Sequence, residues 1–403
     1  MKNRVSPQDI CLPQEARDVL NRLNQAGFEA YLVGGWVRDA LLQRLTNDID
    51  VTTNARPDQI QALFTEYPHS EVGKDHGTIG VKMNGQWIEI TTYRIDQEIH
   101  DHRHPKSVQF TQDLKEDVLR RDFTINALAM NAQLEILDYV QGLKDLEMKC
   151  IRCVGDPQLR FKEDALRILR GLRLSAQLEF ELEASTLQAM YVHAPLLQKL
   201  AVERILTEFS LWMSSAHPSR TLLNALTIVA EFIPEIRQAN PLWLNQLDEL
   251  TSLQQRWMTL FYAADVDSVR HRLHALKVPH VFRNNLLKHL ECVHTEVCLD
   301  KISVKRLAHQ FSKECIEDCF QFQKRFNCPN YSSDAHVIFK QIIEEEACVK
   351  VSALNIKGHD LVSLGFKNKA IQEALDACLE AVMVEDIPNT HEALMAYAQS
   401  LIT

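Results

Sequence analysis

The chain has 403 residues, of which 46% are hydrophobic and 24% charged, proportions that are ordinary for a globular protein of two or more domains. Its formal net charge of −10 argues against a general nucleic-acid coat, although it is compatible with a basic groove on an acidic body. No apolar run is long enough to span a bilayer and the first residues lack an apolar signal core, so we expect a cytoplasmic protein without membrane contact.

The first predicted elements are a short strand, a glycine turn and a helix. Residues 31–33 form an apolar strand that leads into Gly34 and Gly35, and Arg38 lies on the helix that follows. Because glycine has no Cβ, a phosphate could approach the backbone N–H groups at the N-terminus of this helix. Arg38 could then reach the same phosphate.

The second predicted strand carries two acids. Asp48 and Asp50 flank Ile49 in an apolar context, so both carboxylates point to the same face of the strand. They repel each other unless a cation lies between them, and hard oxygen ligands suit Mg²⁺. Metal ligands beside a phosphate cradle indicate metal-assisted phosphoryl or nucleotidyl transfer.

Two more strands are predicted at residues 78–83 and 86–92, because the Asn-Gly pair between them is a strong signal for a two-residue hairpin. Glu89 lies in the middle of the second of these strands. It could complete the metal site, and the alternative is a solvated acid on an outer face. Residues 94–107 are polar and without periodicity, so we expect a mobile loop there.

The next charged motif reads RRDFTINA and contains Arg121. Asp122 or Thr124 could cap a helix that begins here. Arg121 could hold a nucleotide, and the alternative is a surface salt bridge with Glu116 or Asp117.

From about residue 157 the pattern is helical, with a first apolar stripe formed by Ala165, Leu169, Leu172 and Ala176. The same segment carries four charged residues at every third position, Asp164, Arg167, Arg170 and Arg173. On one helix neighbouring members share a face, although the set drifts by about 60° per step. The alternative is a solvated helix with a Glu163–Arg167 pair. Gly171 argues against it, because glycine weakens a helix kept only for stability.

An aspartate and an arginine together could select a base. Cytosine and adenine each present an amino donor beside a ring-nitrogen acceptor, which match a carboxylate and a guanidinium. Uracil and guanine present the reverse order, so both contacts would fail and leave buried polar groups unpaired. One such pair could therefore choose C and A without a template.

The ten cysteines follow no disulfide framework. Cys150 and Cys153 form a lone CxxC, and Cys315 and Cys319 are one residue further apart, so we expect reduced thiols rather than a zinc site. His359 is followed by an aspartate, but no further His/Asp set surrounds it and we expect no metal there.

In this order, the motifs LVGGWVRD, DID, RRDFTINALAMN and EDALRILRGLR resemble those of the class II tRNA nucleotidyltransferases and bacterial poly(A) polymerases. Residues 356–396 look like the C-terminal segment of the CCA-adding members. The resemblance implies an α+β fold, in which a small, polymerase-β-like head with a mixed sheet precedes an all-α neck, body and tail. The expected domains are the catalytic head (1–142), the base-selecting neck (143–205), the helical body (206–330) and a tRNA-binding helical tail (331–403).

By resemblance, Asp48 and Asp50 would be catalytic and would bind Mg²⁺, the implied cofactor. The incoming nucleotide would contact Gly35, Arg38, Arg121, Asp164, Arg167, Arg170 and Arg173, with Asp164 and Arg167 pairing with its base. The implied reaction is template-independent addition of CCA, in which a tRNA 3′-hydroxyl attacks the α-phosphorus of CTP or ATP. The expected partners are the tRNA acceptor arm, CTP and ATP; the sequence does not indicate the oligomeric state.

Three alternatives remain open. An enzyme that adds only CC or only A would carry the same motifs, and so would a poly(A) polymerase, although the short acidic C-terminal end disfavours polyadenylation. A non-catalytic RNA-binding protein on the same scaffold would be indicated by loss of a carboxylate, and both are present. The body also carries basic residues that could contact phosphates or form a solvated helical face: Lys301, Lys305, Arg306, Lys313, Lys324 and Arg325.

Overall fold

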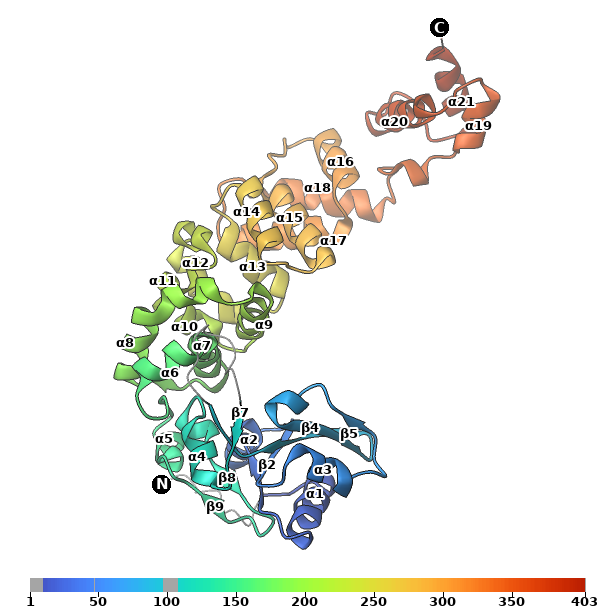
Figure 1. The fold of residues 1–403 in the computed structure, drawn as a ribbon. Coiled ribbons are helices and arrows are strands. Elements are labelled where there is room, and N and C mark those ends of the chain that lie inside the picture. Colours follow the sequence, from blue (N-terminus) through green and yellow to red (C-terminus); the bar gives the residue numbers. More distant parts are fainter. Residues whose placement is uncertain (1–9, 47, 97–107, 403) are drawn as a thin grey trace. The chain divides into compact units, whose positions relative to one another are not determined.

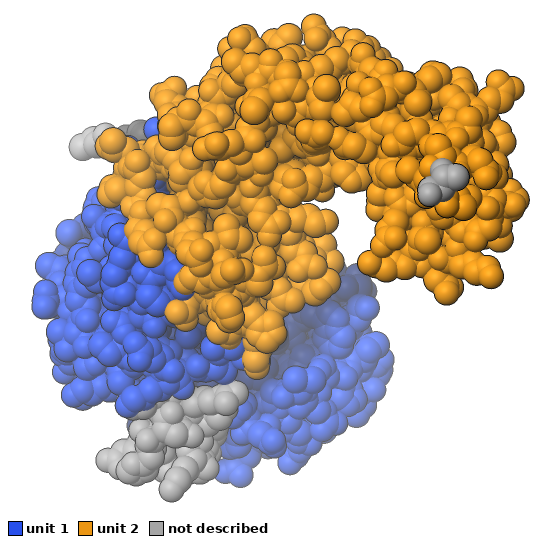
Figure 2. All heavy atoms as spheres, turned by 90° about the horizontal axis from the view of Figure 1, so that it is seen from above, with its two compact units in different colours: residues 1–237, 244–249 blue, residues 238–243, 250–403 orange. Residues whose placement is uncertain are grey.

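The computed structural model describes residues 10–46, 48–96 and 108–402, which form two compact units (Figures 1 and 2). Unit 1 comprises residues 1–237 and 244–249, and unit 2 comprises residues 238–243 and 250–403. Unit 1 begins with a mixed sheet and continues in helices, and unit 2 is helical, which confirms the expected α+β fold. Within the described ranges, no helix is both long and apolar enough to cross a membrane.

The head is built on a seven-stranded mixed sheet with the strand order β3-β4-β5-β2-β1-β8-β9. Its strands are β1 (Ala30–Val33), β2 (Ile49–Thr53), β3 (His69–Ser70), β4 (Thr78–Met83), β5 (Gln86–Thr92), β8 (Ala129–Met130) and β9 (Ile136–Leu137). Strands β2 and β5 run parallel, whereas every other pair is antiparallel. The predicted strands and the hairpin are confirmed, and Asn84 and Gly85 both have positive φ, as a type I′ turn requires.

Four helices accompany the strands of the head: α1 (Gln14–Gln25), α2 (Gly35–Leu41), α3 (Pro57–Leu63) and α4 (Leu114–Leu119). Helix α1 buries Ala16, Val19, Leu20 and Leu23, a three- and four-residue spacing that forms one apolar stripe. It contacts β1, β2 and α3. Strand β2, which carries Asp50, is thus supported by a packed helix.

The loop predicted at residues 94–107 differs from the structure. Residues 94–96 form strand β6 (Arg94–Asp96), which pairs antiparallel with β7 (Val108–Phe110), so the expected loop is shorter than 94–107. Its remaining residues, 97–107, lie outside the described part of the chain.

The helix expected to begin at Asp122 or Thr124 is only a 3₁₀ turn, η3 (Thr124–Asn126), and that prediction was wrong. Both candidate capping side chains have other partners. Asp122 accepts from the backbone N–H of Phe123 and pairs with Arg170, and the Thr124 hydroxyl donates to Asp145. Neither is left to cap a longer helix.

Unit 1 continues through the short parallel pair β10 (Cys150–Ile151) and β11 (Glu181–Leu182) and a series of helices. These are α5 (Gly142–Glu147), α6 (Pro157–Glu163), α7 (Leu166–Leu178), α8 (Ala184–His193), α9 (Val202–Met213), α10 (Pro218–Asn224) and α11 (Leu226–Val229). The predicted apolar stripe around α7 is buried, from Ala165 to Ala176.

Gly171 lies in the middle of α7 for a packing reason. A Cβ at this position would lie 2.4 Å from the Met190 side chain and 2.7 Å from the Phe123 ring, and both side chains are fully buried. The glycine thus lets α7 pack against the motif of the head that contains Phe123. This close approach, and not a contact with a ligand, explains a residue that is otherwise unfavourable in a helix.

We expect Gly171→Ala to lower the free energy of unfolding by about 1–3 kcal/mol, the usual effect of overpacking a filled core. Chemical and thermal unfolding of the full chain measure this loss. The matched control is Gly358→Ala, since its Cβ would meet only Ile371 at an ordinary distance of 3.5 Å. Equal stability of Gly171→Ala and the wild type would contradict the packing argument.

The remaining helices are α12 (Pro241–Leu244), α13 (Leu253–Phe261), α14 (Val266–Ala275), α15 (His280–His294), α16 (Lys301–Gln310), α17 (Lys313–Arg325), α18 (Ser333–Glu344), α19 (Gly358–Ser363), α20 (Lys369–Met383) and α21 (His391–Ser400). The last three helices share a hydrophobic cluster of their own. Several basic side chains of α16 form ion pairs within unit 2: Lys301 with Glu345, Lys305 with Glu385, and Arg306 with Glu380. Lys301 and Arg306 are exposed and ion-paired, as expected for a solvated helical face, whereas Lys305 is buried and fits neither a phosphate contact nor a solvated face.

Candidate active site

Three carboxylates lie near one another at the start of β2, with Asp48 and Glu89 both exposed on either side of Asp50. Asp50 lies on β2 directly beside Glu89 of the parallel strand β5, and aligned neighbours on adjacent strands point to the same face of a sheet. Asp48 is exposed and comes just before β2, not within it as predicted. Burial raises the pKa of Asp50 to about 7, Asp48 and Glu89 add to this rise, and Arg121 and Arg170 oppose it. Negative charge is therefore concentrated here.

Gly34 makes room for this cluster. It has φ 73° and ψ −143° and precedes the first turn of α2. A Cβ at Gly34 would lie 3.2 Å from a carboxylate oxygen of Asp50. The glycine turn and the acid pair, which are separate motifs in the sequence, thus form one site.

We expect Gly34→Ala to slow the nucleotidyl transfer that the sequence implies by about tenfold or more. Asp50 must move away from the new methyl group, and small displacements of reacting groups are costly. The backbone strain should also cost about 1–3 kcal/mol of stability. Single-turnover kinetics and thermal unfolding measure the two effects. Gly27→Ala is the matched control, since Gly27 has φ 85° but no atom within 4 Å of its Cβ position. Equal loss of activity in both variants would contradict the proposed role of the space beside Asp50.

Arg121 is held between Asp117 and the carboxylate cluster. It donates to Asp117 at 3.1 Å, and Arg120 binds the same fully buried carboxylate. Although burial raises the pKa of Asp117, the two arginines lower it below its usual value. The salt bridge weighed as an alternative therefore exists, but it is buried and not on the surface. Arg121 also lies 3.9 Å from the Cβ position of Gly34, beside Asp50.

Arg38 links the glycine turn to the third motif. Its side chain is buried and donates to both carboxylate oxygens of Asp39 and, at 2.6 Å, to Asn126. Asn126 in turn donates to Asp122 at 3.5 Å, and Asp122 binds Arg170 of α7 at 2.8 Å. Asp39 and Asn126 were not predicted as site residues from the sequence. Their place in the motifs LVGGWVRD and RRDFTINA was the only signal for them.

The Asp122–Arg170 pair joins the head to α7. Asp122 is buried, and burial raises its pKa, but Arg170 and Arg167 bring the pKa below the usual value for a carboxyl group. The pKa of Arg170 is raised, chiefly by Asp122. Both groups are therefore charged, and Arg170 also acts on Asp50.

Asp164 does not lie on the helix that carries the three arginines. It has extended backbone angles between α6 and α7, and its side chain accepts from the backbone N–H of Leu166 at 3.0 Å. Its other oxygen binds Arg204 of α9 at 3.0 Å. The predicted single helix was wrong because an aspartate that binds the first turn of α7 favours a break over helix continuation.

Arg167 and Arg173 have separate partners. Arg167 pairs with Glu163, the ion pair expected for a helix without a binding role. It also donates to the backbone oxygen of Arg120 at 3.0 Å. Arg173 pairs with Glu208 of α9 at 2.7 Å. Of the predicted set, Arg170 acts on Asp50 through its charge, Arg167 and Arg173 lie before and after it on α7, and Asp164 precedes the helix.

The carboxylate cluster fits a magnesium ion. Its donors are hard oxygens, and Asp50 is partly buried beside two further negative charges, which makes its ionised form unfavourable without a cation. Asp48 and Asp50 would hold the ion, with Glu89 as a further ligand. An electrophilic ion at this place would polarise a phosphate, and Arg121 and Arg170 would add positive charge beside it.

Comparisons with known proteins show which family the chain belongs to. Residues 30–152 match the family model described as Poly A polymerase head domain, residues 179–239 that of a probable RNA and SrmB-binding site of polymerase A, and residues 248–398 that of a putative tRNA nucleotidyltransferase domain 2. The chain is 31% identical over 397 residues to a CCA-adding enzyme of Streptococcus thermophilus, covering 96% of this chain and 97% of the relative. The chain belongs to the CCA-adding enzymes. It is therefore a nucleotidyltransferase that acts in tRNA processing.

Two further members of the family resemble this chain, one in sequence and one in structure. A CCA-adding enzyme of Streptococcus gordonii is 42% identical over 287 residues, which cover 70% of this chain and 71% of the relative. The crystal structure of the Bacillus stearothermophilus CCA-adding enzyme in complex with CTP aligns with a TM-score of 0.78 at 27% identity, over 96% of this chain and 97% of that one. Sequence and fold thus agree along nearly the whole chain.

Proposed function

We propose that this chain adds C, C and A in turn to the 3′ end of tRNA, taking CTP and ATP as substrates and Mg²⁺ as cofactor. The observation that carries the proposal is the group at the start of β2, where Asp50 lies against Gly34 and is near enough to Asp48 and Glu89 for their charges to act on it. Such a group would hold Mg²⁺, which supplies the positive charge that activates a hydroxyl and stabilises a leaving pyrophosphate. A CTP complex is described for the Bacillus stearothermophilus relative.

The arginines next to the cluster would bind the triphosphate. Arg121 and Arg170 already act on Asp50 through their charge, and a triphosphate placed there would meet both guanidinium groups. Arg38 has three N–H contacts to protein side chains, so we assign it to holding the glycine turn in place and, with Gly35, to the edge of the nucleotide site.

Asp164 and Arg167 would read the base. Asp164 has a carboxylate oxygen bound to Arg204 near the protein surface, and a carboxylate oxygen can accept from a second donor. Arg167 lies one turn further along the chain, beside the backbone of Arg120. Arg173, held by Glu208, would complete the wall of the pocket.

The acceptor would be the tRNA acceptor arm, bound by the helical part of the chain through phosphate and shape contacts. We propose that the head comprises residues 1–142, the neck 143–205, the body 206–330 and the tail 331–403. We place the reaction in the cytoplasm, where tRNA processing of this kind takes place.

The test uses the full chain and three tRNA transcripts that end at the discriminator base, at C and at CC. Labelled CTP and ATP are supplied separately and together. We expect two C residues and then one A on the first transcript, and A alone on the third. No incorporation on any transcript would overturn the proposed activity. Incorporation of one nucleotide type only would identify a CC-adding or A-adding enzyme, and a long A tail would identify a poly(A) polymerase.

A further inference from the structure

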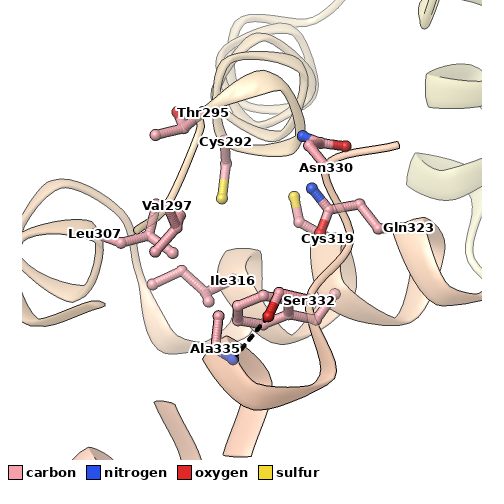
Figure 3. A pocket seen from close by; sticks show the side chains of 11 residues that line it. Cys292, Thr295, Val297, Leu307, Ile316, Cys319, Gln323, Asn330, Ser332 and Ala335 are labelled. Carbon is pink, nitrogen blue, oxygen red and sulfur yellow. Dashed lines mark hydrogen bonds between the residues drawn. The ribbon is translucent and has the colours of Figure 1, made fainter. Parts of the chain in front are cut away.

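Three buried cysteines of unit 2 form a cluster that the reaction does not use. Cys292 lies near the end of α15, and Cys315 and Cys319 lie one turn apart in the first half of α17. Each is at most 4% exposed, and their sulfur atoms all lie within 4.8 Å of one another. Within the described ranges, this is the one group of three potential metal ligands that are so close together. Figure 3 shows the sulfur atoms of Cys292 and Cys319 pointing into the space between the helices.

A histidine of α15 faces the same cluster. His289 precedes Cys292 by three residues, so both lie on one face of the helix. The His289 side chain is only 10% exposed and lies beside Cys315. Its Nε2 atom is 3.4 Å from a carboxylate oxygen of Asp318 and makes no hydrogen bond of good geometry. Cys319 is close enough to donate to the backbone oxygen of His289.

The other ring nitrogen of His289 is oriented as in a metal ligand. Nδ1 lies 2.7 Å from the backbone oxygen of Asn285, and because a carbonyl oxygen only accepts, Nδ1 carries the proton. This bond fixes the ring and directs Nε2 away from Asn285, so that Nε2 would be the ligand atom. Histidines that bind metals typically donate their second nitrogen to a carbonyl or carboxylate in this way.

We propose that Cys292, Cys315, Cys319 and His289 bind one zinc ion that fastens α15 to α17. Three thiolates and one imidazole are a common ligand set of structural zinc sites. Zn–S bonds of about 2.3 Å place tetrahedral sulfurs about 3.8 Å apart, which is compatible with the spacing of the three sulfurs. A shift of the His289 side chain toward the trio would complete four-coordination.

The ligands come from two helices, each of which supplies a pair at helical spacing. His289 and Cys292 are an i, i+3 pair, and Cys315 and Cys319 are an i, i+4 pair, so each pair shares a face of its helix. The two helices pack against each other. The ion would thus join segments that are separated by the chain between residues 295 and 312.

This arrangement explains why the spacing of the cysteines did not indicate zinc. Zinc-binding loops present CxxC pairs, in which two cysteines of a tight turn face one ion. On helices the same convergence needs a spacing of three or four residues, which in the sequence resembles ordinary buried thiols. The partner pair on the second helix becomes visible only when the fold is known.

The first test measures zinc in the full chain, expressed with zinc in the medium and purified under reducing conditions. We expect one zinc per chain by mass spectrometry of the metal. Removal of the metal with a chelator should lower the melting temperature, and adding Zn²⁺ alone should restore it. Titration of the metal-free chain with Co²⁺ should give the visible and charge-transfer bands of tetrahedral thiolate coordination. A wild-type chain that contains no zinc and gives no such bands would overturn the proposal, and this measurement needs no variant.

Variants identify the ligands. Cys315→Ser and Cys319→Ser should lose the bound zinc, whereas Cys378→Ser should keep it, because Cys378 is a buried cysteine of α20 outside the cluster. Retention of zinc by both cluster variants would overturn the site. His289→Gln should bind zinc more weakly than the wild type, and unchanged binding would exclude His289 as the fourth ligand. A disulfide between two of the three cysteines would show as two missing thiols in the unfolded, unreduced chain and would likewise overturn the proposal. None of these measurements depends on nucleotide addition.

Discussion

Asp50→Asn is expected to reduce nucleotide addition by about a thousandfold or more while tRNA binding stays unchanged. The substitution keeps the size of the side chain but removes the charge that would hold Mg²⁺ beside Glu89, and a metal ion of this kind supplies several kcal/mol of transition-state stabilisation. The same result is expected for Asp48→Asn. Addition of CTP to a transcript ending at the discriminator base measures activity, and a filter or gel assay measures tRNA binding.

The matched control for the acid variants is Asp75→Asn, because Asp75 is an exposed aspartate of the same head domain, away from the cluster. Its activity should equal that of the wild type. Thermal unfolding should show that Asp50→Asn is at least as stable as the wild type, since it relieves repulsion from Asp48 and Glu89. An Asp50→Asn variant that keeps more than about a tenth of the activity would contradict the assignment of this carboxylate.

Asp164→Ala is expected to reduce the preference for CTP over UTP by about a hundredfold, with a much smaller effect on triphosphate affinity. The carboxylate would accept from the amino group that cytosine and adenine share, and its removal takes away the contact that uracil cannot make. The triphosphate would still meet Arg121 and Arg170. Competition between labelled CTP and UTP on one transcript measures the preference directly.

Asp164 also has a structural role that needs a control. Its bond to the N–H of Leu166 holds the first turn of α7, and loss of such a bond costs about 1 kcal/mol. Asp265→Ala removes a similar bond at the start of α14 and should leave base choice unchanged. If discrimination against UTP survives in Asp164→Ala, the pairing hypothesis is wrong.

The sequence predicted those parts of the fold that depend on local pattern. The strands at 78–83 and 86–92 follow from alternation around an Asn-Gly turn, and the stripe from Ala165 to Ala176 follows from helical periodicity. Strands β6 and β7 were missed, because three residues are too few for a period to appear. The break in the helix at Asp164 was not predicted, because helix propensities do not include the hydrogen bond that the Leu166 N–H donates to the Asp164 side chain.

For the site, the sequence identified residues but not their partners. Asp50, Gly34 and Arg121 were singled out by type and spacing. Their convergence depends on the antiparallel pairing of β1 with β2, which sets Val33 opposite Asp50, and on the ion pair that holds Arg121 to Asp117 of α4. Arg38 illustrates the limit, because its contact with Asn126 joins residues 88 positions apart. Gly171 was attributed to function, and its close contact with Phe123 shows that packing explains it.

The ion pair between Asp122 and Arg170 has a consequence for exchanging parts between relatives. Together with the contact from Arg167 to the backbone of Arg120, it crosses the expected head–neck boundary at residues 142 and 143. A chimera joined there would take one member of each contact from each parent. If the second parent lacked the matching charge, Asp122 would remain a buried carboxylate without the guanidinium of Arg170, which is strongly destabilising. Viable recombinants should therefore inherit residues 122 and 170 together, as a single unit that the linear order of the chain does not reveal.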